Sequence, residues 1–316
     1  MYTSADRMSE LVEERYELLR VLSRFNIALG FGDKSIECVC REQQLDVNTF
    51  LAVVNMGESG SSPSIESVSV RELMTYLRNA HAYFLDFSLP MIRRKLSEAV
   101  LTVVENEVSR MILHYFDAYT DEVKRHMAYE EQEVFPHVEA LLRGEQEDYS
   151  IEEFARQHRV SDDDYVIARI TELKNILIKY YPSEGKNELL YSVLFDVFTY
   201  QRDLAMHCRL ENELFIPAVR MLTGGGADCS VKDEHSAEVK DVLSARERDI
   251  IIGVVKGMTN KEIADSLFLS VHTVTTHRKN IARKLRIHSP AGLTIYAIVN
   301  KLVALGDLPD IYTGRV

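Results

Sequence analysis

The chain has 316 residues, 46% of them hydrophobic, and a mean hydropathy of −0.14, so it can bury at least one large core and divide into two or three domains. It contains no apolar run long enough to cross a bilayer, and its first residues lack the basic and apolar regions of a signal peptide. We therefore expect neither membrane insertion nor secretion but a cytoplasmic location, and the formal net charge of −12 argues against a general affinity for nucleic acids.

Helical periodicity dominates the sequence. Apolar residues recur at spacings of three and four, whereas alternating patterns and strand-turn dipeptides are scarce, which predicts an all-α protein. The stretches Gly57–Pro63 and Thr223–Ser230 interrupt the pattern and are polar and flexible enough to be linkers. We predict a small helical domain over residues 1–56, a middle domain over 66–222, a linker over 223–240 and a C-terminal domain over 241–316.

The N-terminal domain contains a distinctive turn. The stretch Arg24–Ser35, followed by Ile36–Val39 and Leu45–Val47, resembles the small N-terminal domain of the di-iron proteins that repair iron–sulfur clusters. That family has a cysteine pair in the turn where this chain reads Gly30-Phe31-Gly32-Asp33. Because the dithiol is missing, an adapted sensory role is favoured over a repair activity.

Cysteines are few and favour no thiol chemistry. Cys38, Cys40, Cys208 and Cys229 are too few for a disulfide framework in a chain of this length, which agrees with a reducing compartment. Cys38 and Cys40 could pair with a metal or with each other. A Cys-x-Cys pattern alone, however, favours two ordinary thiols.

The middle domain places histidines inside helical stripes of apolar residues. One stripe consists of Leu73, Leu77, His81 and Leu85. A second consists of Ile112, Phe116, Tyr119, Val123, His126, Glu130 and Val134. A third consists of Val193, Val197, Tyr200, Leu204, His207, Glu211 and either Leu214 or Phe215. Each histidine therefore stands where the periodicity puts a core residue.

In the second and third stripes a glutamate follows the histidine by four residues, which puts both side chains on one inward face. Burying two such pairs without a partner is costly, and a metal ion removes that cost. Imidazole and carboxylate on facing helices suit iron, manganese or zinc. A single pair would favour a hydrogen-bonded or solvent-facing histidine, but two matching pairs favour a metal site.

The contexts Glu130-Glu131-x-x-Val134-Phe135-Pro136 and Glu211-x-x-x-Phe215-x-Pro217 complete this pattern. Together with the stripes they resemble the hemerythrin-like four-helix bundle and its di-iron site, over most of residues 66–222. The resemblance implies two iron ions, with manganese or zinc as alternatives, bridged by the two glutamates. It implies that the metal ligands are His81, His126, Glu130, His158 or its substitute Asp162, His207 and Glu211. We expect His114 and His137 to pack or lie outside the ligand shell, and Glu131 and Glu213 to face solvent.

The C-terminal domain has the opposite charge and clear helix boundaries. From Asp241 onward the sequence holds 11 Lys and Arg against 7 Asp and Glu, or +4, which leaves 26 against 42, or −16, for the rest. Ser244 and Glu247 form a capping-box pattern, which predicts a helix that ends at Gly257. Further helices are predicted over Asn260–Leu267 and Val271–Leu285. Only this domain has the charge that attracts a polyphosphate partner.

These helices resemble the LuxR-type helix-turn-helix family. The matching positions are Leu243-Ser244, Arg246-Glu247, Gly257, Thr259 to Ala264, Leu267, Ser270, Thr273-Val274, His277 and Lys284-Leu285. In that family the third helix enters the major groove. The resemblance implies base-reading roles for Thr275, Thr276 and Lys279, and backbone contacts for Lys261, Ser270, Thr273, Arg278 and Lys284. His277 is expected to be structural. The alternative is that these cations form a solvated helix face. A last helix, Pro290–Leu305, would be the family's dimer contact, through Leu293, Tyr296, Ala297 and Val299 or their neighbours.

These features predict a DNA-binding regulator and not an enzyme. The alternating strands and helices of a receiver domain are absent, so control by aspartyl phosphorylation is not expected. Instead, a di-iron domain would sense oxygen, nitric oxide or redox state and alter how a homodimer engages double-stranded DNA. One alternative is a di-iron repair or peroxide enzyme with a DNA-binding tail. Another is a regulator whose bundle binds no metal and serves interactions.

Overall fold

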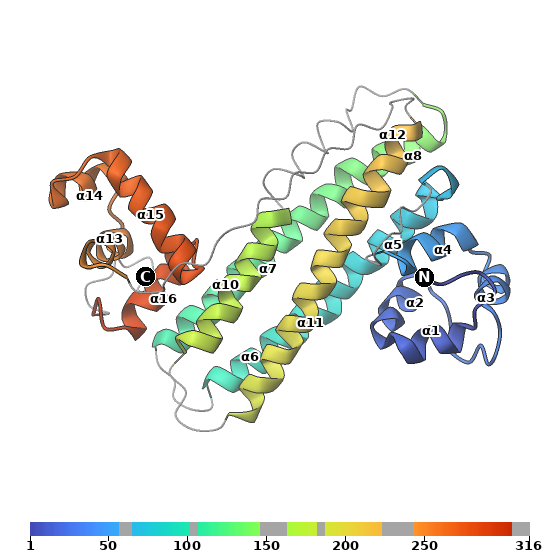
Figure 1. Ribbon diagram of the computed structural model, residues 1–316, viewed down its shortest axis with the longest axis horizontal. Helices are drawn as coiled ribbons and strands as arrows, with labels where there is room; N and C mark the ends of the chain where they lie inside the picture. Colours follow the sequence, from blue (N-terminus) through green and yellow to red (C-terminus); the bar gives the residue numbers. More distant parts are fainter. Residues whose placement is uncertain (57–64, 102–106, 146–162, 182–186, 223–242, 305–316) are drawn as a thin grey trace. The chain divides into compact units, whose positions relative to one another are not determined.

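The computed structural model describes residues 1–56, 65–101, 107–145, 163–181, 187–222 and 243–304. Within these ranges the chain contains helices and no strand, which confirms the predicted all-α class (Figure 1). The chain forms two compact units. The first comprises Met1–Ser88, Lys124–Asp163 and Asp203–Ser230, and the second comprises Leu89–Val123, Asp164–Arg202 and Val231–Val316. The middle of the chain therefore contributes to both units. The predicted domain boundaries fall in or beside undescribed ranges and stay a prediction.

Short helices form the N-terminal part of the first unit. They are α1 (Met8–Glu14), η1 (Tyr16–Leu18), α2 (Leu19–Arg24), α3 (Ile36–Glu42), α4 (Val47–Val54) and η2 (Ile65–Ser67). The side chain of Ser35 caps α3 and that of Asp46 caps α4. Gly30 and Gly32, with φ of 92° and 59°, adopt the left-handed conformation that the turn between α2 and α3 requires.

The long helices of the middle segment are divided between the two units. They are α5 (Val70–Ala82), α6 (Leu89–Leu101), α7 (Glu107–Tyr129), α8 (Phe135–Leu142), α10 (Asp163–Lys179), α11 (Glu188–Leu210) and α12 (Ile216–Leu222). In the first unit, buried apolar side chains of the N-terminal helices and of α5, α8 and α12 form one continuous cluster. The N-terminal helices and these bundle segments therefore share a core.

Three of the long helices contain a π-helical turn, and each turn is followed by a proline. The turns are η3 (Tyr83–Ser88), η4 (Glu130–Val134) and η6 (Glu211–Phe215), and the prolines are Pro90, Pro136 and Pro217. A proline has no N–H for the carbonyl four residues earlier, and in each case that carbonyl belongs to the π turn. A wider turn offers the carbonyl another donor. The prolines thus give a local reason for the widened turns.

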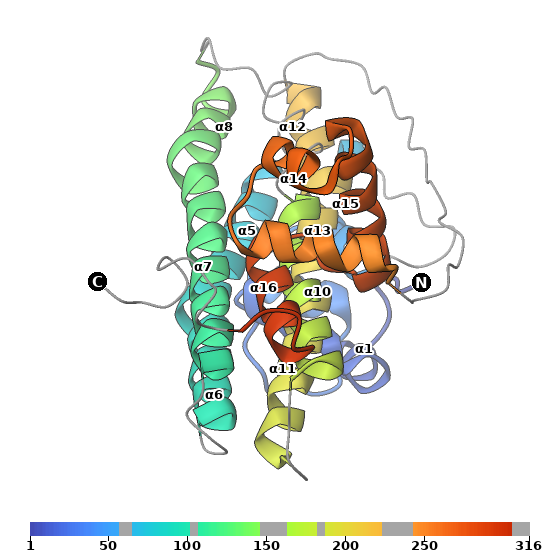
Figure 2. The same ribbon diagram turned by 90° about the vertical axis from the view of Figure 1, so that its left-hand side faces the viewer.

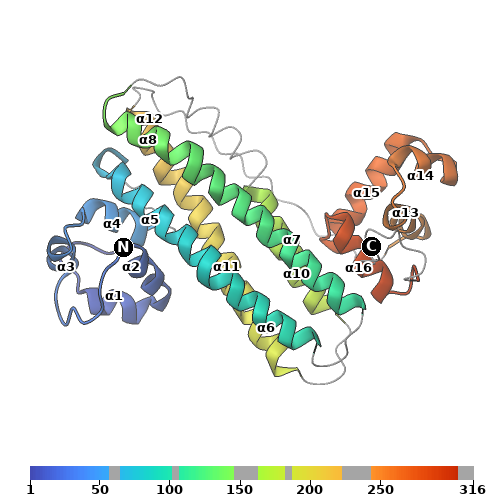
Figure 3. The same cartoon turned by 180° about the vertical axis from the view of Figure 1, so that it is seen from behind.

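In the second unit, the remaining parts of α6, α7, α10 and α11 run alongside one another (Figures 1 and 3). Lys95 of α6 donates to Asp196 of α11 at 2.6 Å. The hydroxyl of Tyr119 on α7 donates to that of Tyr200 on α11 at 3.0 Å. These contacts cross between helices, and apolar stripes fill the space between them.

The C-terminal helices of the second unit follow the predicted boundaries closely. They are α13 (Ala245–Val255), α14 (Asn260–Leu267), α15 (Val271–Leu285) and α16 (Pro290–Val299), shown face on in Figure 2. The capping box of Ser244 and Glu247 is present, and Thr259 and Glu262 form a second one on α14. The last helix ends at Val299 instead of Leu305, because Lys301 turns the chain into the left-handed region at φ 55°.

No helix in the described ranges is both long and apolar enough to span a membrane.

Candidate metal centre and nucleic-acid interface

Four buried side chains converge within the first unit. His81 lies in the last turn of α5 and His207 in the last turn of α11, while Glu130 begins η4 and Glu211 begins η6. One potential ligand atom from each residue lies within 4.8 Å of the other three. Each residue is at most 3% exposed. Imidazoles and carboxylates from separate helices thus meet inside the bundle.

Each glutamate lies beside a histidine. His81 Nε2 is 2.9 Å from Glu130 Oε2, and His207 Nε2 is 2.9 Å from Glu211 Oε1. The less deeply buried His126 places Nε2 3.3 Å from Glu130 Oε1. Five of the six residues proposed as ligands are therefore close together.

Two further histidines of the middle segment, His114 and His137, lie outside this cluster. His158 and its proposed substitute Asp162 lie outside the described residues, so the sixth ligand stays a prediction. His137 is buried in α8, whereas His114 on α7 is exposed. Neither belongs to the group of convergent ligand atoms.

The donor set fits a metal ion. Both ring nitrogens of His207 are buried and make no hydrogen bond of good geometry among the described residues, although Nε2 lies 2.9 Å from Glu211 Oε1. Leaving such an atom unsatisfied costs about 1–3 kcal/mol, and the two buried carboxylates beside them add negative charge in a poorly solvated place. A cation offsets both costs. Mixed imidazole and carboxylate ligands suit iron, manganese or zinc.

Aromatic rings surround the histidines. The ring of Phe135 stacks on that of His81 with centroids 5.7 Å apart, and the ring of Phe84 meets that of His207 edge-on at 5.6 Å. The two imidazoles lie 5.1 Å apart. Such apolar walls limit solvent access and hold the ring orientations.

Glu131 belongs to the site, contrary to the prediction that it faces solvent. Its Oε1 lies 2.9 Å from His81 Nδ1, the nitrogen opposite the one that faces Glu130. Arg78 holds this carboxylate by donating to Glu131 Oε2 at 3.2 Å and to Glu139 at 2.8 Å. A carboxylate on the far nitrogen fixes the tautomer and the orientation of a ligand imidazole. The π turn gives Glu130 and Glu131 access to the two sides of one ring.

The pKa of His81 reflects these neighbours. Burial lowers the pKa of the imidazole, but hydrogen bonds with Glu130 and Glu131, together with the charges of Glu130 and Glu211, raise it from 6.5 to about 9. Without metal, the ring is therefore protonated at neutral pH. Because a ligand imidazole must be neutral, a metal ion that binds here displaces that proton.

A buried ion pair ties the N-terminal helices to the ligand helices. Arg24 of α2 is 4% exposed and donates to both oxygens of Asp203, at 2.9 and 2.8 Å. Asp203 lies one helical turn before His207. The backbone oxygen of Arg24 accepts from the amide of Asn79, two residues before His81, at 2.7 Å. One residue thus contacts two ligand helices, a link that the sequence pattern did not reveal.

Helix α15 and its N-cap carry the hydroxyl groups that the LuxR-type resemblance assigns to DNA contacts. Ser270 caps the helix by accepting from the Thr273 N–H at 3.1 Å. Thr275 and Thr276 donate their hydroxyls to carbonyl oxygens one turn earlier, at 3.0 Å each. These two hydroxyl hydrogens are therefore engaged within the helix, which leaves the threonine methyl groups for the base contacts, and such methyl groups suit the methyl group of thymine.

The four expected cations differ in their surroundings. Lys261 and Lys279 are exposed. Arg278 donates to the amide oxygen of Asn260 at 2.6 Å, and Lys284 donates to Glu247 at 2.8 Å with only 16% of its side chain exposed. The last two cations therefore already stabilise the domain itself. Their roles at DNA stay a prediction, as do those of the other residues.

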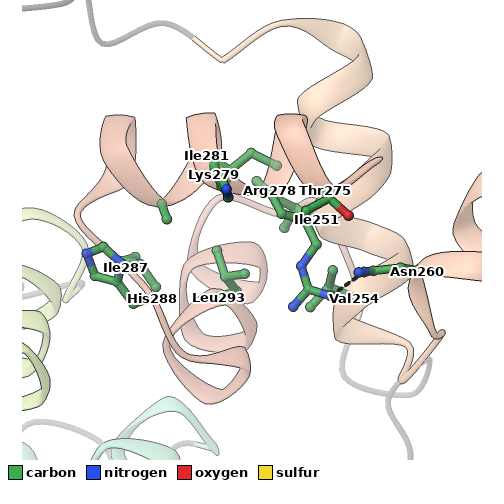
Figure 4. Close-up of a pocket in the computed structure, with 11 residues that line it drawn as sticks. Ile251, Val254, Asn260, Thr275, Arg278, Lys279, Ile281, Ile287, His288 and Leu293 are labelled. Carbon is green, nitrogen blue, oxygen red and sulfur yellow. Dashed lines mark hydrogen bonds between the residues drawn. The ribbon is translucent and has the colours of Figure 1, made fainter. Parts of the chain in front are cut away.

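A pocket of about 230 Å³ lies beside α15 (Figure 4). Its apolar lining includes Ile251, Val254 and Leu293, and its polar lining includes Thr275 and Lys279. Two of the three proposed base-reading residues, Thr275 and Lys279, thus lie beside apolar side chains of the helical domain.

Two family descriptions match this chain. Residues 73–219 match the hemerythrin HHE cation binding domain, and residues 241–297 match the bacterial regulatory proteins of the luxR family. These matches confirm the hemerythrin-like and LuxR-type resemblances and the predicted fold class, whereas the resemblance of the N-terminal residues to repair proteins stays a prediction. The chain therefore contains a hemerythrin-type cation-binding domain and a LuxR-type helix-turn-helix domain.

Curated relatives share shorter stretches of sequence. The transcriptional regulatory protein MctR of Rhizobium johnstonii is 39% identical over 95 residues, which are 28% of this chain and 44% of MctR. The Fimbriae Z protein of Escherichia coli is 37% identical over 105 residues, or 30% of this chain and 50% of that protein. The oxygen regulatory protein NreC of Staphylococcus carnosus is 45% identical over 62 residues, or 20% of this chain and 29% of NreC. The chain thus spans half or less of each.

The position of Glu131 generates a test of the metal centre. Glu131→Gln should weaken metal binding by about 10- to 100-fold, because the amide is a poorer partner for His81 Nδ1 than the carboxylate is. Chelator competition with the metal-free protein measures this change. Glu133→Gln, in the same π turn but exposed, is the matched control and should bind metal like the wild type. Equal affinities for both variants would show that Glu131 does not support the ligand.

Proposed function

We propose that this chain, in which a hemerythrin HHE cation-binding domain precedes a LuxR-type domain, is a transcription regulator controlled by a non-heme di-iron centre. The signal is oxygen, nitric oxide or cellular redox state. The response is a change in how the C-terminal domain binds double-stranded DNA. The observation that carries this proposal is the buried cluster of His81, Glu130, His207 and Glu211.

The chain's own residues would hold two metal ions. His81, His126 and His207 supply imidazole nitrogens, and Glu130 and Glu211 supply carboxylates that the hemerythrin resemblance makes bridging ligands. Iron is the favoured metal, with manganese or zinc as alternatives. A di-iron centre supplies the capacity to bind a diatomic ligand or to change its oxidation state.

The enclosure of the site favours sensing over processing of a large substrate. His81, Glu130, His207 and Glu211 are at most 3% exposed, so an incoming molecule must be small. The rings of Phe84 and Phe135 add apolar surface around the imidazoles. Uncharged diatomic molecules pass through such surroundings more easily than charged or polar substrates do, because they lose little hydration.

The C-terminal domain supplies the output of the proposed regulator. α15 carries the exposed Lys279 and the paired threonines, and Lys261 lies at the start of α14. Lysine can donate to guanine in the major groove, while cations near a helix start attract phosphate. The proposal includes a homodimer on DNA and a cytoplasmic location, and the names of the regulatory relatives support a role in transcription.

A di-iron enzyme with a DNA-binding tail is the chief alternative, and it predicts turnover of a repair or peroxide substrate. Stoichiometric binding without turnover supports the regulator. The other alternative is a bundle that binds no metal and serves interactions. Metal bound to the purified protein would exclude it, and an absence of bound metal would support it.

Metal content tests the sensor half of the proposal. Protein purified without oxygen should contain about two iron ions per chain, and its optical spectrum should change on exposure to air or nitric oxide. His207→Ala should remove most of the iron, because it deletes a buried ligand, whereas His114→Ala on the exposed face of α7 should not. Iron well below two per chain that does not respond to His207→Ala would eliminate the di-iron sensor.

DNA selection from a random library tests the output half. Lys279→Ala should relax the sequence preference, because it removes a proposed base contact. Lys261→Ala should weaken binding to all sequences about equally and lower the slope of log affinity against log salt by about one. If both variants lose affinity without a change in preference, the base-reading role of Lys279 is wrong.

A further inference from the structure

The outer face of α11 carries an exposed aromatic stripe. Tyr191, Phe195 and Phe198 are 62%, 69% and 48% exposed, and their spacing of four and three residues puts them on one side of the helix. The ammonium of Lys174 on α10 lies 4.6 Å from the centre of the Phe198 ring, and Ile178, one turn further along α10, is 53% exposed. The apolar surface thus extends from α11 toward α10.

The size of this stripe matches half of a specific interface. A large aromatic side chain buries roughly 150–250 Å², so the exposed parts of Tyr191, Phe195 and Phe198 amount to roughly 270–450 Å², to which Ile178 adds a smaller area. A symmetric pair of such surfaces would bury roughly 540–900 Å² from the aromatic side chains alone, so Ile178 and the flanking polar side chains supply the rest of the about 1,200 Å² at which stable interfaces begin. On monomeric proteins, exposed apolar patches of several hundred Å² are often interaction sites.

Charges at the two ends of the stripe are complementary under a two-fold axis. Glu188 lies seven residues before Phe195 and Arg202 lies seven residues after it. If two copies of α11 pack antiparallel with Phe195 on the axis, each Glu188 faces Arg202 of the other copy, and Tyr191 faces Phe198. Together these residues follow the alternating three- and four-residue spacing of a helix-packing face.

We propose that this stripe is a homodimer surface at which α11 packs antiparallel against α11 of a second copy. The occupant is another copy because the stripe is self-complementary in both charge and apolar spacing. A C2 contact of this kind needs the same patch on both partners. This dimer does not use α16, so it is separate from the dimer contact proposed on DNA.

Sedimentation of the full chain over a range of concentrations tests the proposal. The wild type should be dimeric, and Phe195→Asp should be monomeric with unchanged helical content, since the residue is exposed. Glu188→Arg and Arg202→Glu should each weaken the dimer about tenfold, because each places like charges opposite each other. The double variant should restore the dimer. A monomeric wild type, or a dimer that ignores all of these changes, would overturn the proposal.

A cross-link provides a second measurement. Phe195→Cys should form an intermolecular disulfide under a mild oxidant, because a residue on a two-fold axis meets its own copy. Glu133→Cys, exposed on η4, is the control and should cross-link no faster than collision allows. Equal cross-linking of the two variants would contradict the antiparallel arrangement.

A second observation concerns the start of α16, within the second unit. Glu172 of α10 is 1% exposed and accepts from the backbone N–H groups of His288 and Ser289, at 3.2 Å each. It also accepts from the Ser289 hydroxyl at 2.5 Å. Burial raises the pKa of this carboxyl, and the hydrogen bonds from Ser289 and His288 oppose that rise. A bundle residue thus binds the positive end of a helix of the C-terminal domain.

A glycine makes this contact possible. A Cβ at Gly292 would lie 1.8 Å from Glu172 Oε1, so only glycine allows the carboxylate so close to the first turn of α16. Further along α16, the ring of Tyr296 packs edge-on against Tyr180 at the end of α10, with centroids 4.8 Å apart. Tyr296, which the family resemblance assigns to the dimer contact, therefore packs against the bundle helix α10.

We infer that Glu172 holds α16 against the bundle and thereby opposes DNA binding, an inference that rests on the proposed DNA-binding function. Glu172→Ala and Gly292→Ala should each increase the DNA affinity of the full chain. The increase should be roughly tenfold if most wild-type molecules have α16 docked on the bundle. The double variant should gain no more than either single variant, because both remove one contact. Asp117→Asn, an exposed carboxylate in the same unit, is the control for the change in charge.

Amide hydrogen exchange separates the contact from the proposed function. Both single variants should speed exchange at His288 and Ser289, whose amides donate to Glu172. Faster exchange with unchanged DNA affinity would overturn the inhibitory role while leaving DNA binding in place. If no form of the chain binds DNA, the proposed function itself fails. Unchanged exchange would show that Glu172 does not hold α16.

Discussion

Two carboxylates and two imidazoles buried at one point set the main physical constraint on this protein. Buried negative charge destabilises a helical core unless a cation or hydrogen bonds compensate it. Protonated His81 offers part of that compensation, and a metal ion offers more. Contacts around the cluster keep it in one arrangement despite the remaining cost in free energy. Arg78 pairs with Glu131, and the ring of Phe135 stacks on that of His81.

The three π turns show how local sequence builds that arrangement. Glu130 and Glu211 each begin a π turn, and His81 lies two residues before a third. In an uninterrupted α-helix, Glu130 and Glu131 would point about 100° apart, and only one would face the core. The wider turn that precedes Pro136 changes this register. The prolines, which look like helix breakers in the sequence, therefore shape the site.

Periodicity was sufficient to predict that the histidines and glutamates on the inward faces of regular helices converge. The four-residue spacing of His126 and Glu130 identified them as neighbours, and the structure places them 3.3 Å apart. The starts of the C-terminal helices were equally predictable, because a capping residue such as Ser244 contacts a residue only three positions away. Contacts between distant segments were not predictable. Glu131 was assigned to solvent because helical periodicity ignores the π turn, and Lys284 showed no sign of its partner Glu247, 37 residues away.

The pair of Arg24 and Asp203 gives the N-terminal helices a part in the metal centre. These residues are 179 positions apart, and their two hydrogen bonds are buried beneath the rings of Tyr76 and Phe84. Removing Asp203 would leave the buried Arg24 without its carboxylate, at a cost of several kcal/mol, whereas Asp203 itself also has Arg20 2.9 Å away. The helix that carries His207 is therefore fixed by the N-terminal domain as much as by the bundle. This gives a physical reason why the N-terminal helices share a core with the cation-binding domain: they support the helix that carries His207.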